Sequence, residues 1–258
     1  MSAKGRTVKT DVCNAPVSLE DGPALESWNA MIRAFLAHGT ATPQHLGAVL
    51  AAQPDFAMGQ AARGLFSLLM GRAEMWQVAE DARIAAHKGA AQAGLHARER
   101  HWVAALDAWL SDRPSGAVAE LERAQTACPQ DTLPAKTIHA IRIVLGDAAG
   151  MRQSVENVLP AHGRAHPLYG YLLGCHAFAL EETGDYAAAE RVGLEGLNYT
   201  TDDAWGLHAV THVHDMRAEP DKGIALIEAH KGAWDGSNYF RYHVWWHTAL
   251  LHHARGEL

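Results

Sequence analysis

The sequence has few cysteines, no long apolar run and no dense block of basic residues. Cys13, Cys128 and Cys175 are odd in number and widely spaced, which argues against a disulfide framework and for a reducing compartment. We therefore expect a cytoplasmic protein. The apolar runs are broken by glycine or charge, so no membrane-spanning segment is predicted. The net charge is −7 and the lysines and arginines are scattered, so nucleic acid is not an expected partner.

The chain also lacks any β-strand pattern. Apolar residues with a helical period of 3.6 fill nearly everything after residue 22, as in YGYLLGCHAFALEE, and short breaks such as ETGDY separate these segments. Residues 1–22 have neither this period nor the apolar core of a signal peptide. The sequence therefore predicts a flexible N-terminal arm over residues 1–22 and an all-α helical repeat domain over residues 23–258.

The breaks between the helical segments recur at regular intervals. The turn positions are Asp112, Gly146, Gly184, Ala218 and Gly256, which are 34, 38, 34 and 38 residues apart. One helix–turn–helix unit per roughly 34 residues is typical of tetratricopeptide repeats. Small residues at Ala117, Ala189 and Gly223, five after a turn, fit the close helix crossing of such a unit. We expect a tetratricopeptide-like α-solenoid of stacked helical hairpins.

The last repeat stops after its first helix, at HHARGEL. A solenoid normally ends in a polar capping element, because an uncapped end exposes apolar surface. The sequence therefore predicts a solenoid that is incomplete at its C-terminus, or an end that a partner covers. Self-association through this end is one form of that hypothesis.

The repeat frame also predicts which residues face a concave groove. In tetratricopeptide repeats the first helix of each unit lines this groove. Applied here, the frame brings histidine, aromatic and carboxylate side chains together. The predicted ligand-binding residues are Trp102, Trp109, Tyr171, Phe178, Asp203, Trp205, His208, His212, Asp215, His243, Trp246 and His247.

Two histidine pairs stand out in this set. His208 and His212, like His243 and His247, are four residues apart and share one helix face. Such a pair can chelate Zn²⁺, Ni²⁺ or Cu²⁺, contact an organic ligand, or form a hydrogen-bonded polar layer. No metal site is assigned from the sequence, but these four histidines are the candidates for Zn²⁺, with oxygen ligands from Asp215 or Glu99.

A catalytic interpretation uses the same residues. The catalytic candidates are His208, His212, His247 and Glu99. His208 or His247 would act as general base, and Glu99, whose pKa rises if it is desolvated, or Asp215 would orient or protonate. The glutamate of the H-E-x-x-H metalloproteases is absent, because Ala-Val-Thr separates His208 from His212. No G-x-S-x-G, P-loop or G-x-G-x-x-G motif is present, so the chemistries of those motifs are not expected.

The histidine segments carry a family resemblance. DAWGLHAVTHVHDM and NYFRYHVWWHTALLHHARGE resemble the tetratricopeptide repeat protein 38 family, whose segments read D-x-W-x-x-H-A-x-x-H-V and N-x-F-x-x-H-x-x-W-H-x-A-L. The matching residues are Asp203, Trp205, His208, His212, Asn238, Phe240, His243, Trp246 and His247. An upstream R-E-x-x-H element is matched only at Arg98 and Glu99. The resemblance starts near residue 24 and implies an all-helical fold but no particular activity. Family members are longer, which favours the incomplete-solenoid interpretation.

Three functions are compatible with these patterns. The leading hypothesis is a binding protein whose groove holds a small polar or cationic molecule, or a peptide, without a cofactor. The second is an enzyme that uses the groove histidines and a carboxylate, with metal-assisted hydrolysis as one form. The third is a scaffold for protein partners.

Overall fold

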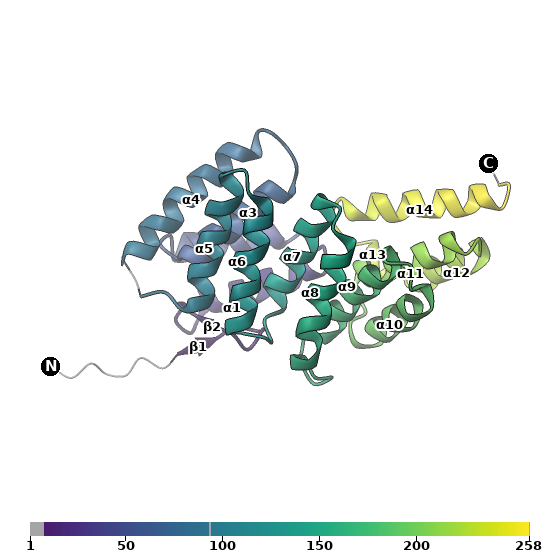
Figure 1. Ribbon diagram of the computed structural model, residues 1–258, viewed down its shortest axis with the longest axis horizontal. Coiled ribbons are helices and arrows are strands. Elements are labelled where there is room, and N and C mark those ends of the chain that lie inside the picture. Colours follow the sequence, from purple (N-terminus) through teal and green to yellow (C-terminus); the bar gives the residue numbers. More distant parts are fainter. Residues whose placement is uncertain (1–7, 93, 258) are drawn as a thin grey trace. The chain divides into compact units, whose positions relative to one another are not determined.

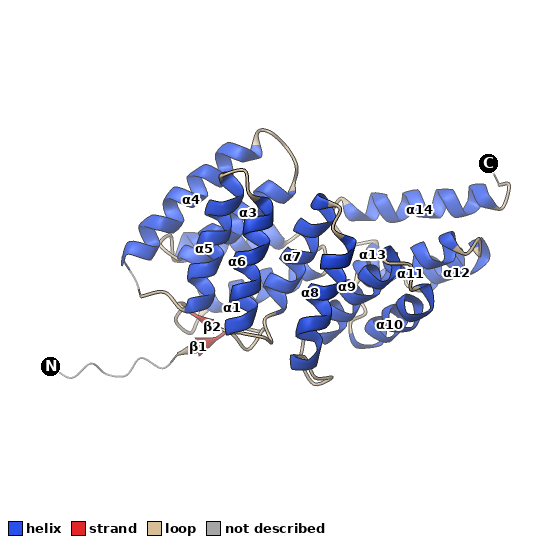
Figure 2. Cartoon of the chain, viewed as in Figure 1, coloured by secondary structure: helices blue, strands red, loops and turns tan. Residues whose placement is uncertain are grey.

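The chain is all-α, as the sequence predicts. The computed structural model describes residues 8–92 and 94–257, and in these residues it contains fourteen α-helices, one 3-10 turn and one pair of two-residue strands. Figures 1 and 2 show that the two strands lie near the N-terminus and that helices make up nearly everything else. Neighbouring helices pack in pairs, so the helical hairpin is the building block of the fold.

The chain divides into two compact units, where the sequence predicts a single repeat domain over residues 23–258. Unit 1 contains the described residues up to Met31 and Pro43–Pro134, and unit 2 contains Ile32–Thr42 and Ala135–Leu258. The helices α1 (Pro23–Leu36) and α7 (Thr132–Leu145) have residues in both units. The elements of unit 1 are β1 (Lys9–Thr10), β2 (Pro16–Val17), most of α2 (Thr42–Ala52), α3 (Ala57–Leu69), α4 (Met75–Gln92), α5 (Ala97–Leu110) and α6 (Pro114–Ala127).

Unit 2 holds the remaining helices. They are α8 (Ala148–Val158), the 3-10 turn η1 (Leu159–Ala161), α9 (Tyr169–Glu182), α10 (Tyr186–Tyr199), α11 (Ala204–Met216), α12 (Pro220–Ala229), α13 (Lys231–Trp234) and α14 (Phe240–Ala254). Within this unit α9 packs on α10, and α11 packs on α9, α10, α12 and α14. The apolar core around Phe178 and Trp205 joins α9 to α11, and a second core around Val244 and Leu251 joins α14 to its neighbours.

All five predicted turn positions are confirmed as left-handed turns. Their φ angles lie between 55° and 82° in Asp112, Gly146, Gly184, Ala218 and Gly256. At each of them the next residue's N–H binds the carbonyl five positions back, as Glu219 N does to His214 O at 2.8 Å. This is the Schellman motif, which ends a helix and satisfies its last carbonyls. His38 and Gly71 also have positive φ and end α1 and α3, so the turns extend further upstream than the sequence indicated.

The second helix of several hairpins begins with a local signal in the sequence. The carboxylates of Asp147 and Asp185 accept hydrogen bonds from the backbone N–H three residues on, at 2.9 and 3.4 Å. Pro114 and Pro220 occupy the first position of α6 and α12, where no intrahelical N–H partner is needed. Turn and cap together explain why α6, α8, α10 and α12 each begin two residues after a left-handed residue.

Residues 8–22 do not form the flexible arm that the sequence predicts. β1 pairs with β2 in an antiparallel hairpin, and the side chains of Cys13, Ala15, Val17 and Leu19 are buried. Residues 1–7 of that predicted arm lie outside the described residues. The sequence pattern is silent here because the hairpin is short and is held by polar contacts from other elements.

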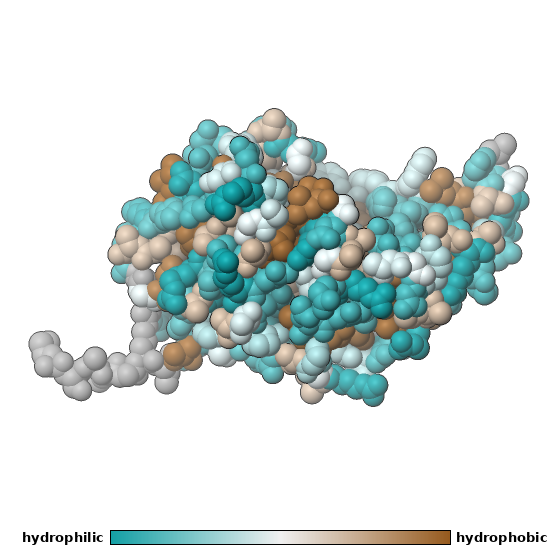
Figure 3. All heavy atoms as spheres, viewed as in Figure 1, coloured by the Kyte–Doolittle hydropathy of each residue, from teal (hydrophilic) through white to brown (hydrophobic). Residues whose placement is uncertain are grey.

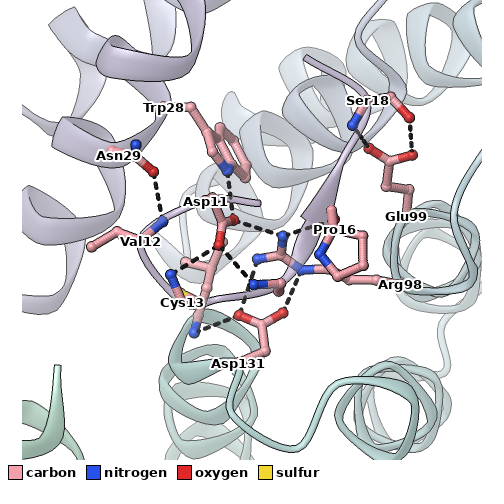
Figure 4. A network of polar contacts seen from close by, with 12 residues as sticks. Asp11, Val12, Cys13, Pro16, Ser18, Trp28, Asn29, Arg98, Glu99 and Asp131 are labelled. Atoms are coloured by element: carbon pink, nitrogen blue, oxygen red, sulfur yellow. Dashed lines mark hydrogen bonds and ion pairs between the residues drawn. The ribbon is translucent and has the colours of Figure 1, made fainter. Parts of the chain in front are cut away.

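The hairpin of residues 8–22 is held by a buried arginine (Figure 4). Arg98 is fully buried, and its guanidinium donates to Asp11 at 2.6 Å and to Asp131 at 3.0 Å. Asp11 also accepts from Trp28 Nε1 at 3.0 Å. Next to it, the Glu99 carboxylate accepts from the backbone N–H of Ser18 at 2.8 Å. A buried guanidinium with two carboxylates is stable only while its partners remain, so this network fixes the hairpin within unit 1.

None of the helices in the described part of the chain is both long and apolar enough to cross a bilayer. On the face drawn in Figure 3, hydrophobic residues form small patches between hydrophilic ones. The aromatic side chains with the highest exposed fractions lie on or next to α14, at Tyr239, Tyr242, Trp245 and Trp246.

The left-handed turns make a paired prediction. Gly184→Ala should lower the free energy of unfolding by about 1 kcal/mol, because alanine is strained at positive φ. Nothing lies within 4 Å of a Cβ placed there, so backbone strain alone is measured. Ala218→Gly, at φ 55°, should raise the stability or leave it unchanged. Urea denaturation of both variants checks this, and a destabilised Ala218→Gly would contradict it.

The buried network makes a second prediction. Arg98→Met leaves two carboxylates buried without their cation, and should cost about 3–5 kcal/mol of unfolding free energy. Asp131→Asn keeps the Arg98–Asp11 pair and should cost clearly less. Equilibrium unfolding measures both. Equal costs, or a loss below about 1 kcal/mol for Arg98→Met, would show that the arginine does not hold the hairpin.

Candidate functional site

Four histidines from two packed helices of unit 2 converge on one point. His208 and His212 lie one turn apart on α11, and His243 and His247 lie one turn apart on α14. The Nε2 atom of His243 is 2.9 Å from that of His208 and 3.1 Å from that of His247. The Nε2 atoms of His212 and His247 are 3.1 Å apart. We call His208, His212, His243 and His247 the histidine quartet.

The packing of each helix explains this convergence. On α14 the residues Val244, His247 and Leu251 are buried, and their spacing of three and four places them on the face that packs against the rest of unit 2. His243 lies one turn before His247 at the exposed edge of this face. α11 is buried almost throughout, and His208 is only 3% exposed. The quartet therefore extends from the interior of unit 2 to its surface.

Hydrogen bonds alone do not satisfy the quartet. A ring nitrogen of a neutral imidazole is either a donor or an acceptor, and it has one direction in the ring plane for that bond. His243 Nε2 faces both His208 and His247, and His247 Nε2 faces both His243 and His212. Two of the three contacts can be hydrogen bonds, but the third then joins two nitrogens whose proton or lone pair is already engaged in another bond.

A divalent metal ion satisfies all four nitrogens at once. The candidate ligand atoms lie within 4.8 Å of one another. Zn–N bonds of 2.0–2.1 Å in a tetrahedron put ligand nitrogens roughly 3.3 Å apart, close to the observed spacings. Two histidines at i, i+4 on each of two helices supply this geometry without any loop movement.

Two members of the quartet, His208 and His247, are held in their neutral form. Burial lowers the pKa of His208 well below its usual value, and the neighbouring His212, His247 and His243 lower it further. Burial lowers the pKa of His247 to about 4, with added repulsion from His212 and His243. Neutral imidazole is the form that binds a metal, so these side chains are in the ligand form at neutral pH.

Aromatic rings surround the buried end of the quartet. The ring of Phe178 stacks on His208 with centroids 5.6 Å apart, and Trp205 and Phe240 lie 5.2 and 5.1 Å from it. Phe178 and Trp205 also pack on each other at 4.5 Å. These rings fix the imidazole of His208 and exclude water from its side of the quartet.

Trp205 has its own polar partners. Its Nε1 donates to His139 Nε2 at 2.9 Å, and the ammonium of Lys136 lies 4.6 Å from its ring centroid. His38 stacks on the same ring at 5.5 Å. The cation on the Trp205 ring is therefore a side chain of this protein, and the ligand-binding role of Trp205 stays a prediction.

Glu181, at the end of α9, is the nearest carboxylate with a contact to the quartet. Its Oε2 lies 3.5 Å from His212 Nδ1, and the residue is only 6% exposed. Its neighbour Glu182 is exposed, and both could join His212 in a second group of metal-ligand atoms. Burial raises the pKa of Glu182, and the charge of Glu181 raises it further.

Asp203 caps the start of α11 and is buried away from solvent. Its Oδ2 lies so close to Gly174 and Gly206 that a Cβ on either would be 2.0 or 2.5 Å from it. Burial raises the pKa of Asp203 to about 7, although Lys136 opposes this. Tyr171 OH donates instead to the neighbouring Asp202 at 2.8 Å. Asp203 and Tyr171 thus shape the start of α11, and neither has a contact with the quartet among the described interactions.

The structure separates the other predicted site residues from the quartet. Trp102, Trp109 and Glu99 belong to unit 1, where Trp102 is fully buried. Glu99 closes the capping box of α5 and binds Ser18, so its partners are not those expected for a general acid or base. Asp215 is half-buried in the last turn of α11 and is absent from the described metal-ligand groups. Trp246 is 59% exposed on α14.

Sequence reasoning missed three residues of this region. Lys136 and Glu181 occupy inward positions of the repeat frame, so the sequence places both on the groove face. Neither is among the predicted site residues. His38 follows α1 in a left-handed turn and carries no helical period. Its carbonyl accepts from Asn238 N at 2.7 Å and its ring stacks on Phe240 at 4.7 Å, contacts that no local pattern announces.

Comparison with known proteins adds no family to this description. No protein-family model matches the chain, and no solved structure matches it significantly. The function is therefore inferred from the geometry of the quartet.

The lowered pKa values predict how the metal-free protein responds to acid. The folded state keeps His208 and His247 neutral, so below pH about 6.5 the unfolded chain binds more protons and the free energy of unfolding falls as the pH falls. Each such histidine contributes at most about 1.4 kcal/mol per pH unit. His247→Gln should reduce this slope between pH about 6.5 and 4, whereas the exposed His253→Gln should not. Urea denaturation at several pH values measures the slopes, and identical slopes in all proteins would contradict the expectation.

Proposed function

We propose that the protein is a metal-binding helical repeat protein, in which the histidine quartet holds one divalent ion of the late first-row transition metals, with Zn²⁺ as the first candidate. The observation that carries this proposal is a series of four Nε2 atoms, in the order His208, His243, His247 and His212. Neighbouring atoms in this series are 2.9–3.1 Å apart, and hydrogen bonds cannot fully satisfy them. An all-imidazole ligand set suits Zn²⁺, Cu²⁺ and Ni²⁺ better than Mg²⁺ or Ca²⁺.

The geometry favours ion binding over hydrolysis. Catalytic zinc sites keep a position open for water and use three protein ligands, whereas four protein ligands complete a tetrahedron. Hydrolysis at the quartet would require one histidine to leave, and His243 is the exposed member of the set. The predicted small polar ligand or peptide, and the scaffold role, gain no specific contact from the described residues around the quartet.

We further propose that the helical hairpins are tetratricopeptide-like repeats. The support is the recurrence of Schellman turns at Asp112, Gly146, Gly184, Ala218 and Gly256, with the near-34-residue spacing of that class. In this arrangement α11 and α14 are the first helices of successive units. Their equivalent faces then carry the two histidine pairs, and the repeat itself builds the quartet from two copies of one i, i+4 pattern.

Elemental analysis tests the proposed function. The purified chain is incubated with Zn²⁺, excess metal is removed with a weak chelator, and zinc is measured per chain. We expect about one Zn²⁺ in the wild type and almost none in the double variant His208→Ala/His212→Ala, because two remaining imidazoles hold zinc far more weakly than four.

The matched control removes two histidines from α14, the helix of the other quartet pair, at positions outside the quartet. His252→Ala/His253→Ala should keep the zinc content of the wild type, and circular dichroism should show unchanged helicity in all variants. A wild type that retains no zinc, or a quartet variant that retains as much as the wild type, would rule out the proposal.

A further inference from the structure

A buried carboxylate lies behind one member of the quartet. Glu181 ends α9, and α9 packs directly on α11, which carries His212. The Glu181 Oε2 is 3.5 Å from His212 Nδ1, and this oxygen has no hydrogen-bond partner within the described residues. His212 thus presents its Nε2 to the quartet and its Nδ1 to a buried, unpaired carboxylate oxygen.

We propose that Glu181 is the positioning residue of the metal site: it binds His212 Nδ1–H and thereby holds the ring with Nε2 facing the ion. This inference rests on the proposed metal-binding function. A histidine that binds a metal through one nitrogen carries a proton on the other, and a carboxylate that accepts this proton fixes the tautomer and strengthens the metal bond. The distance needs to shorten by only about half an ångström to become a hydrogen bond.

Charge supports the same assignment. The quartet offers only imidazoles and no anionic ligand, so a bound divalent ion would bring two uncompensated positive charges into a partly buried site. Glu181 is the one carboxylate with an ion-pair contact to a quartet member among the described residues. Its negative charge, separated from the ion by a single imidazole ring, offsets part of that cost.

Other groups near the quartet do not supply this interaction. His208 Nδ1 and His247 Nδ1 have no hydrogen-bond partner within the described residues, so neither ring is oriented in this way. Asp203 is buried against Gly174 and Gly206 at the opposite end of α11 from His212. Of the four quartet members, His212 alone has a carboxylate behind it.

The test compares zinc affinity in three substitutions, using competition with a chromophoric chelator. Glu181→Gln keeps an acceptor oxygen but loses the charge, and should weaken Zn²⁺ binding about tenfold. Glu181→Leu loses both and should weaken it up to about 100-fold. Glu228→Gln removes an exposed carboxylate of α12 that has no described contact with the quartet, and should change the affinity by less than about twofold.

Two further readouts separate positioning from a structural role. The melting temperature of the metal-free variants should equal that of the wild type, because Glu181 then has no hydrogen bond to lose on its Oε2 side. The absorption bands of the Co²⁺-loaded protein should shift in Glu181→Leu and not in Glu228→Gln, since only the former changes the ligand field of His212.

The outcomes distinguish this inference from the function on which it rests. If the wild type binds Zn²⁺ and both Glu181 variants bind it equally well, Glu181 has no positioning role while the metal site stands. If Glu228→Gln weakens binding as much as Glu181→Gln, the effect is one of net charge and the inference is wrong. If the wild type binds no Zn²⁺, the proposed function and this inference fail together.

Discussion

The histidine quartet is governed by a constraint of imidazole chemistry: each ring nitrogen forms one bond in the ring plane, as donor or as acceptor. When four Nε2 atoms approach to about 3 Å in a continuous series, protons cannot serve every contact, whereas one metal ion can. The burial of His208 and the aromatic rings around it strengthen this constraint, because water has no access from that side and the charged form is disfavoured.

The helical hairpins deliver these nitrogens to one place. Four of the five Schellman turns end one helix and are followed by the next within two residues, so equivalent faces recur at nearly constant spacing along the chain. α11 and α14 lie in contact and each presents an i, i+4 histidine pair, so their packing alone closes the quartet. Lys136 and His139 hold Trp205, and Trp205 in turn packs against His208, which ties the site to the core of unit 2.

Local patterns were sufficient for some of this structure. Helical period and turn residues predict the hairpins, and the frame they define places both histidine pairs on inward faces. Contacts between segments distant in the chain were not accessible in this way. The buried network of Arg98 with Asp11 and Asp131 joins residues far apart in sequence. Local patterns therefore predict a flexible arm where this network holds a hairpin. Asp215 has the sequence spacing expected of a metal ligand, yet the carboxylate that contacts His212 belongs to Glu181, on another helix.

X-ray absorption spectroscopy at the zinc edge of the loaded protein tests the central claim most directly. The account predicts a first shell of about four nitrogen atoms near 2.0 Å, with the outer-shell scattering pattern of imidazole rings. A shell that contains sulfur, or one made of oxygen without imidazole scattering, would show that the metal binds elsewhere and that the histidine quartet is not its site.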